Sequence, residues 1–224
     1  MPEQAGITKM IAVLIKKELV TEWRQRSITG GLLLYVISTV FICYLSMKRI
    51  VDLPVWNALF WIIQVFIGVN GIARSFLQES RGRMLYYYTI ADPRAMIFSK
   101  MIYGAVLMVL LSLINLIVYS VLIGNPVQDH LMFIVCLLLG SIGFSAVITM
   151  VSAIASKASN NAGLVAILGF PVLLPLLQTI IRFSKNAMDG TGWTVAERYL
   201  IILLALNLMV TSLAYLLFPY LWRD

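Results

Sequence analysis

Hydrophobic positions divide the chain into one short amphipathic stretch and six long apolar segments. In residues 7–27 apolar residues recur every fourth position with lysine and arginine between them, which predicts a helix lying on a membrane surface. Each later segment is near the roughly 20 apolar residues that a spanning helix needs. We place the segments at Thr29–Met47, Val55–Leu77, Ala95–Ile123, Leu131–Ser156, Gly163–Ile181 and Tyr199–Leu221. The pattern predicts an all-α integral membrane protein with a single transmembrane domain, residues 1–224.

Composition and charge support this class. The chain is 61% hydrophobic and 12% charged, whereas a soluble domain carries about 25% charged residues, so an ordinary soluble enzyme is excluded. The net charge is +7, and cytoplasmic loops of membrane proteins collect lysine and arginine, so topology explains the charge without nucleic acid. Most lysines and arginines lie before the first segment or around the connection between the second and third segments, and we count Lys100 with that connection. This excess of positive charge on one side places both termini in the cytoplasm. Trp56, Trp193, Tyr220 and Trp222 lie near segment ends and predict an aromatic belt.

The sequence contains little that could perform catalysis. It has no G-x-x-x-x-G-K-[ST] loop for nucleotide phosphates, and no aspartate or glutamate falls within the predicted spans. Cys43 and Cys136 lie in apolar runs and are expected to be small buried hydrophobic residues. His130, in a short loop, is expected to be a solvated surface residue, with a heme or metal ligand as the less favoured reading. We therefore predict a non-catalytic subunit with no bound cofactor or metal; any ATP hydrolysis must come from a partner.

The connection at residues 79–94 is basic but also carries apolar and aromatic residues. Met84, Leu85, Tyr87 and Tyr88 give it an apolar face, and Asp92-Pro93 is suited to begin the next helix as cap and first-turn proline. A short cytoplasmic helix of this kind would dock onto a partner protein. The alternative is a helix that rests on the lipid surface.

Polar residues within the spans are small and uncharged. The fourth span carries a stripe at helical spacing, and shorter polar faces occur in the second and sixth spans. These residues are Ser141, Ser145, Thr149, Ser152 and Ser156; Asn57, Gln64, Gly68 and Gly71; and Asn207, Thr211 and Tyr215. Helix packing is favoured over a substrate-lining role. Pro171 and Pro175 predict a kinked or interrupted fifth span, which could be a moving element or a static kink.

Several short patterns, in order along the chain, carry a family resemblance. They are Lys17-Glu18-Leu19 with Arg24, Arg74-x-Phe76-x-x-Glu79-x-x-Gly82 leading to Pro93 and Lys100, Leu139-Gly140, and Phe170-Pro171-Val172-Leu173-Leu174-Pro175-Leu176-Leu177. Together they resemble the heme exporter protein B (CcmB) family of cytochrome c maturation. The family often has an acidic residue shortly after the loop glycine and a leucine-rich stretch before the proline, and the chain departs from it there with Met84, Leu85 and three tyrosines.

The resemblance implies the permease subunit of an ATP-binding-cassette transporter of the second exporter type, in the bacterial inner membrane. Its partners would be a CcmA-like ATPase that binds the ATP, the CcmC-, CcmD- and CcmE-like heme-handling proteins, and a second copy of the chain. Heme would be the candidate cargo, or ATP hydrolysis would release the heme-loaded chaperone. The coupling residues would be Glu79, Gly82, Met84, Leu85, Tyr87, Tyr88 and Pro93, with a gating kink at Pro171 and Pro175.

Two alternatives stay open from the sequence. A permease of the same architecture could carry another cargo, such as a lipid, a drug or a polysaccharide. A membrane scaffold that transports nothing could hold partner proteins together.

Overall fold

A computed structural model describes residues 2–24, 26–46, 52–77, 92–158 and 162–223, and these residues form seven α-helices. The helices are α1 (Pro2–Arg24), α2 (Arg26–Ser46), α3 (Leu53–Leu77), α5 (Pro93–Ile123), α6 (His130–Ala158), α7 (Ala162–Asp189) and α8 (Trp193–Arg223). The expectation of an all-helical chain is therefore confirmed for the residues described.

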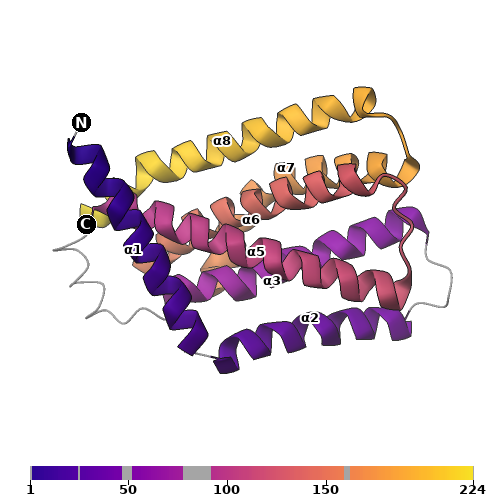
Figure 1. Ribbon diagram of the computed structural model, residues 1–224, viewed down its shortest axis with the longest axis horizontal. Coiled ribbons are helices and arrows are strands. Elements are labelled where there is room, and N and C mark those ends of the chain that lie inside the picture. Colours follow the sequence, from indigo (N-terminus) through magenta and orange to yellow (C-terminus); the bar gives the residue numbers. More distant parts are fainter. Residues whose placement is uncertain (1, 25, 47–51, 78–91, 159–161, 224) are drawn as a thin grey trace.

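The helices that follow α1 lie beside one another in alternating directions, and α1 lies across one end of the bundle that they form (Figure 1). Both chain termini lie at that end, together with the last turn of α3 and the first turn of α5. α1 packs mainly against α5 and touches α2. The amphipathic N-terminal segment is thus a helix that covers one end of the bundle.

Five helices contain stretches that are long and apolar enough to cross a membrane. These stretches are Leu53–Ile72, Pro93–Ile123, His130–Ser156, Ile167–Asp189 and Trp193–Tyr220. In α2 the corresponding apolar stretch among the described residues, Gly30–Ser46, is shorter. The helices fit a multi-pass membrane protein, whereas the prediction of six spans is not confirmed.

Helix α6 is the centre of the bundle because it packs against α3, α5, α7 and α8. Small residues allow α5 and α6 to approach closely. A Cβ atom on Gly104 of α5 would lie 2.6 Å from Ser145 Oγ of α6, so a larger residue would not fit there without a shift. The Ser145 hydroxyl donates to the Met101 carbonyl at 2.9 Å, and Ser141 and Ser112 share a hydroxyl hydrogen bond of 2.8 Å. Among the stripe residues, Ser141, Ser145, Thr149 and Ser152 are fully buried. This arrangement supports the packing role.

Aromatic rings fill the half of the bundle away from α1. Trp56 stacks on Phe60 and meets Tyr119 edge-on, with centroid distances of 5.5 and 4.9 Å. The Trp56 indole N–H donates to the Gly124 carbonyl at 2.9 Å, and its side chain is 1% exposed. The expectation that Trp56 is a headgroup anchor was wrong, because proximity to a segment end does not show which way a side chain points. Trp193 and Tyr220 are exposed.

Helix α7 continues without interruption through Pro171 and Pro175, both of which are exposed. Each proline removes one backbone donor, yet the residues on either side stay helical where α7 packs extensively against α6. Of the two sequence expectations for this segment, the interruption is excluded and a kink remains a prediction.

Candidate partner interface at one end of the bundle

The predicted coupling segment lies between α3 and α5 in the sequence, and the end of α3 and the start of α5 both lie at the end of the bundle that α1 covers (Figure 1). Six of its expected contact residues lie outside the described residues: Glu79, Gly82, Met84, Leu85, Tyr87 and Tyr88. Their part in partner binding therefore stays a prediction. The helices on both sides of the segment are described and show what it is attached to.

The start of α5 has the local structure that its sequence predicts. Asp92 caps the helix, because its side-chain Oδ1 accepts a hydrogen bond from the Arg94 backbone N–H at 2.7 Å. Pro93 occupies the first turn, where its missing N–H leaves no bond unmade. The Asp92 backbone N–H lies 3.4 Å from Met10 Sδ of α1. The helix start is confirmed, and α1 lies beside it.

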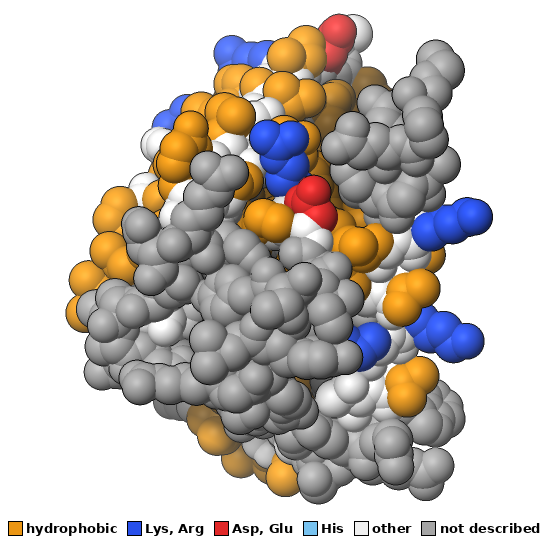
Figure 2. Space-filling view, turned by 90° about the vertical axis from the view of Figure 1, so that its left-hand side faces the viewer, with side chains coloured by type: hydrophobic (Ala, Val, Ile, Leu, Met, Phe, Trp, Pro, Cys, Tyr) orange, Lys and Arg blue, Asp and Glu red, His pale blue; other side chains and the backbone are white. Residues whose placement is uncertain are grey.

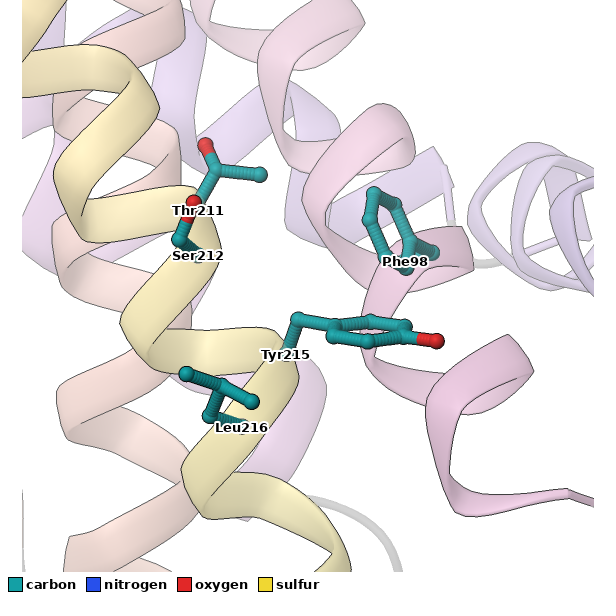
Figure 3. A pocket seen from close by; sticks show the side chains of 5 residues that line it. All are labelled: Phe98, Thr211, Ser212, Tyr215 and Leu216. Carbon is teal, nitrogen blue, oxygen red and sulfur yellow. The ribbon is translucent and has the colours of Figure 1, made fainter.

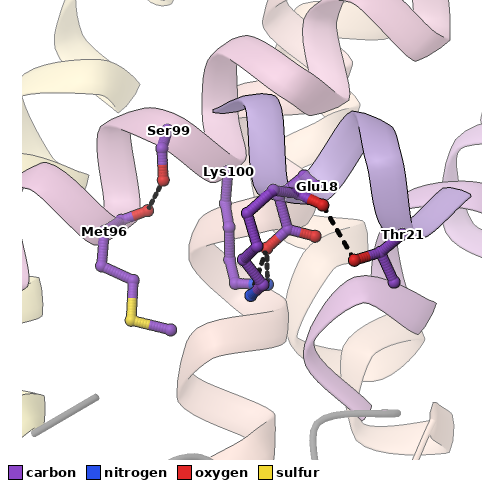
Figure 4. A network of polar contacts seen from close by, with 6 residues as sticks. Glu18, Thr21, Met96, Ser99 and Lys100 are labelled. Carbon is purple, nitrogen blue, oxygen red and sulfur yellow. Dashed lines mark hydrogen bonds and ion pairs between the residues drawn. The ribbon is translucent and has the colours of Figure 1, made fainter. Parts of the chain in front are cut away.

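A buried ion pair joins α1 to α5 about two turns into α5 (Figure 4). Lys100 Nζ lies 3.2 Å from Glu18 Oε1, and Lys17 Nζ lies 3.1 Å from the same oxygen. The Lys100 side chain is 1% exposed and that of Glu18 is 12% exposed. Assigning Lys100 to a cytoplasmic loop was wrong. A lysine inside an apolar segment calls for a polar partner, and that signal was present in the sequence.

The protonation state of Glu18 follows from its burial and its two lysine neighbours. Burial by itself raises the pKa of the Glu18 carboxyl, but the ammonium groups of Lys100 and Lys17 lower it by more. The net result is a pKa below the ordinary value, so Glu18 is ionised at neutral pH. The contact between α1 and α5 is therefore a true ion pair.

Two more basic features occur at the same end. Arg94 is exposed; its Nη1 donates to the Tyr215 hydroxyl at 3.1 Å and its guanidinium lies 4.8 Å from the centre of the Tyr215 ring. Lys9 and Lys16 of α1 are exposed. Figure 2 looks onto this end and shows lysine and arginine side chains projecting from it. The described surface at this end of the bundle thus carries several basic side chains.

A family model described as "CcmB protein" matches residues 9–220, nearly the whole chain. The chain belongs to the CcmB family. This confirms the resemblance to heme exporter protein B and gives the chain a role in c-type cytochrome biogenesis, as a membrane permease component for heme transport. No curated protein and no solved structure matches the chain significantly.

Other residues of this CcmB-family chain that drew attention in the sequence lie away from that end. His130 is exposed at the first position of α6, with its Nε2 3.3 Å from Asn125 Nδ2. Cys43 is half-buried and Cys136 is buried, and both are free thiols. Within the described residues no cluster of three or more histidine, cysteine, aspartate or glutamate side chains is placed to hold a metal.

Proposed function

We propose that this CcmB-family chain is the membrane subunit of an ATP-binding-cassette complex for c-type cytochrome biogenesis. A separate CcmA-like ATPase would bind and hydrolyse the ATP. The family match over residues 9–220 is the observation that carries the proposal. The absence of a phosphate loop from the sequence supports the assignment of hydrolysis to a partner.

The proposed topology has six spans, with both termini in the cytoplasm of a bacterial inner-membrane protein. α2 supplies the sixth span: its 21 residues correspond to about 30 Å of helix, close to the thickness of the hydrocarbon core. Its course beside the other five helices supports this role (Figure 1). The exposed Lys9, Lys16 and Arg94 at the α1 end fit a cytoplasmic face.

In this complex, residues 79–94 would be the coupling segment that contacts the ATPase. Movement of the segment would reach α5 directly, because Pro93 begins that helix. It would then reach α1 through the ion pair between Lys100 and Glu18. Two copies of each subunit, together with CcmC-, CcmD- and CcmE-like proteins, would complete the assembly.

The output of the coupled movement would be heme export or release of the heme-loaded chaperone. Heme is then cargo, and ATP stays on the partner subunit. Pro171 and Pro175 are candidate gating positions, because each weakens the backbone bonding of α7 without ending the helix.

Co-purification tests the ATPase pairing. The tagged chain, extracted in mild detergent, should carry the ATPase with it, and the double variant Tyr87→Ala/Tyr88→Ala should lose most of it while still inserting into the membrane. Tyr44→Ala, which alters an exposed tyrosine of α2, is the matched control and should retain the ATPase. The pairing is refuted if wild type recovers no ATPase, or if the control loses as much as the double variant.

Heme staining tests the cargo. Deletion of the chain should abolish covalent heme in c-type cytochromes, whereas normal cytochromes would point to a permease for another cargo. A reconstituted complex whose ATP hydrolysis does not respond to its membrane subunits would point to a scaffold.

A further inference from the structure

A groove lies between α5 and α8, in the part of the bundle nearer to α1 (Figure 1). It has a volume of about 430 Å³ and is lined by Phe98, Thr211, Ser212, Tyr215 and Leu216. Figure 3 shows the Tyr215 ring reaching from α8 toward α5, with Phe98 beside it and Thr211 further along α8. The volume lies in the range of about 300–1,000 Å³ typical of small-molecule sites.

Arg94 sits at the rim of this groove. Its guanidinium is held above the Tyr215 ring and donates to the Tyr215 hydroxyl, so its position is fixed by a groove residue. Arginine has five N–H donors, and the bond to Tyr215 uses one nitrogen, Nη1. Phe98 follows Arg94 by one helical turn and packs edge-on against Tyr215 at 5.6 Å. A cation is therefore held against a lining residue of a cleft whose walls are mainly apolar.

Charged and apolar side chains follow one another in a fixed order along the groove. Arg94 is in the first turn of α5, nearest the bundle end, whereas Phe98 and Thr211 lie farther toward the middle of the bundle (Figures 1 and 3). Charge at the rim followed by apolar walls inward matches the order of a phospholipid, whose phosphate lies at the membrane surface and whose acyl chains point inward. Basic pockets between membrane helices recognise anionic headgroups in this way.

We infer that the groove binds an anionic glycerophospholipid, with its phosphate at Arg94 and one acyl chain running inward past Tyr215 and Phe98 toward Thr211. The cation selects the occupant, because a zwitterionic lipid gains less from the Arg94 guanidinium. The Asp92 carboxylate, which accepts the Arg94 backbone N–H as the cap of α5, lies nearby and offsets part of this preference. Lipid in this site would brace α5 against α8 where the coupling segment ends.

Native mass spectrometry of the purified full-length chain tests the inference. The chain is titrated with phosphatidylglycerol and with phosphatidylcholine of identical acyl chains. Wild type should bind phosphatidylglycerol about fivefold more tightly, the gain expected from one arginine near the surface. Arg94→Gln should remove this preference.

Arg198→Gln is the matched control. Arg198 also stacks on a tyrosine at 4.8 Å and donates to its hydroxyl at 3.1 Å, but its partner is the adjacent Tyr199. Arg198→Gln should therefore keep the lipid preference. Leu216→Trp places a bulky ring in the groove at an exposed position and should weaken binding of both lipids while the protein stays monodisperse.

Several outcomes would overturn the inference. These are equal binding of both lipids by wild type, a preference that survives Arg94→Gln, and an equal loss in Arg198→Gln. If Leu216→Trp changes the oligomeric mass and leaves lipid binding intact, a second copy of the chain is the occupant and the lipid site is refuted. The titration uses the chain alone, so its result is separate from that of the ATPase co-purification.

Discussion

Replacing Glu18 by glutamine should release α1 from the end of the bundle. Glutamine keeps the shape of the side chain but removes the carboxylate that faces Lys100 at 3.2 Å and Lys17 at 3.1 Å. The buried ammonium of Lys100 then faces a neutral amide. Breaking a fully buried pair costs about 3–5 kcal/mol. Because Glu18 retains 12% exposure, water compensates in part, and we expect about 2–3 kcal/mol.

Amide hydrogen exchange measures this cost where it acts. Among the described helices, the larger interfaces of α1 are with α5 and α2. It can therefore open locally while the rest of the bundle stays folded. A loss of about 2–3 kcal/mol corresponds to about 30- to 140-fold faster exchange. This acceleration should appear in residues 9–21 of the protein in lipid nanodiscs and leave α6 unchanged.

The control is Glu197→Gln, which removes an exposed carboxylate from α8 and should leave exchange of α1 within about twofold of wild type, since exposed charges contribute little. The double variant Glu18→Gln/Lys100→Met should recover part of the loss, because it removes both charges together. Exchange of residues 9–21 that is the same in Glu18→Gln as in wild type would refute the view that the ion pair docks α1.

Further outcomes follow from the same structure. Because the folded-state pKa of Glu18 is lowered, the pair contributes fully above the ordinary carboxyl value of 4.5, and its contribution is lost as pH falls through the folded-state pKa. The protection factors of α1, which are exchange rates corrected for the intrinsic pH dependence of amide exchange, should therefore fall only on that acid side. Gly143→Ala should destabilise by about 1–3 kcal/mol, because a Cβ there meets side chains of α7 and α8. Gly30→Ala, with nothing within 4 Å, should instead stabilise by about 0.5–1 kcal/mol; thermal unfolding that moves both variants the same way would contradict this packing. Pro171→Ala/Pro175→Ala should raise the unfolding temperature, and a loss of c-type cytochromes in the same variant would identify a gating role, whereas unchanged cytochromes would identify a static kink.

Local sequence chemistry predicted the elements whose causes are local. Asp92-Pro93 marked the start of α5 because cap and first-turn preferences involve adjacent residues, and the apolar runs marked the long helices by length alone. The partner of Lys100 could not be read in that way, because Glu18 lies 82 positions earlier and only the crossing of α1 over α5 brings them together. Trp56 was misplaced for a related reason: its environment depends on a carbonyl 68 positions away.

The first two turns of α5 determine how movement of the coupling segment could spread. Within them α5 is tied to α8 through Arg94 and to α1 through Lys100, and directly afterwards its Met101 carbonyl accepts a hydrogen bond from Ser145 of α6. A helix held by three neighbours in a close-packed interior cannot bend freely at its start. Displacement of the segment before Pro93 would therefore shift α5 as a rigid body together with α1 and α8, and α6, which packs against four helices, would receive the shift along its small-residue stripe. Helix α5 contacts α1 through an ion pair, whereas it contacts α6 through packed glycine and serine. Glu18→Gln should therefore uncouple α1 alone and leave the transfer of movement from α5 to α6 intact.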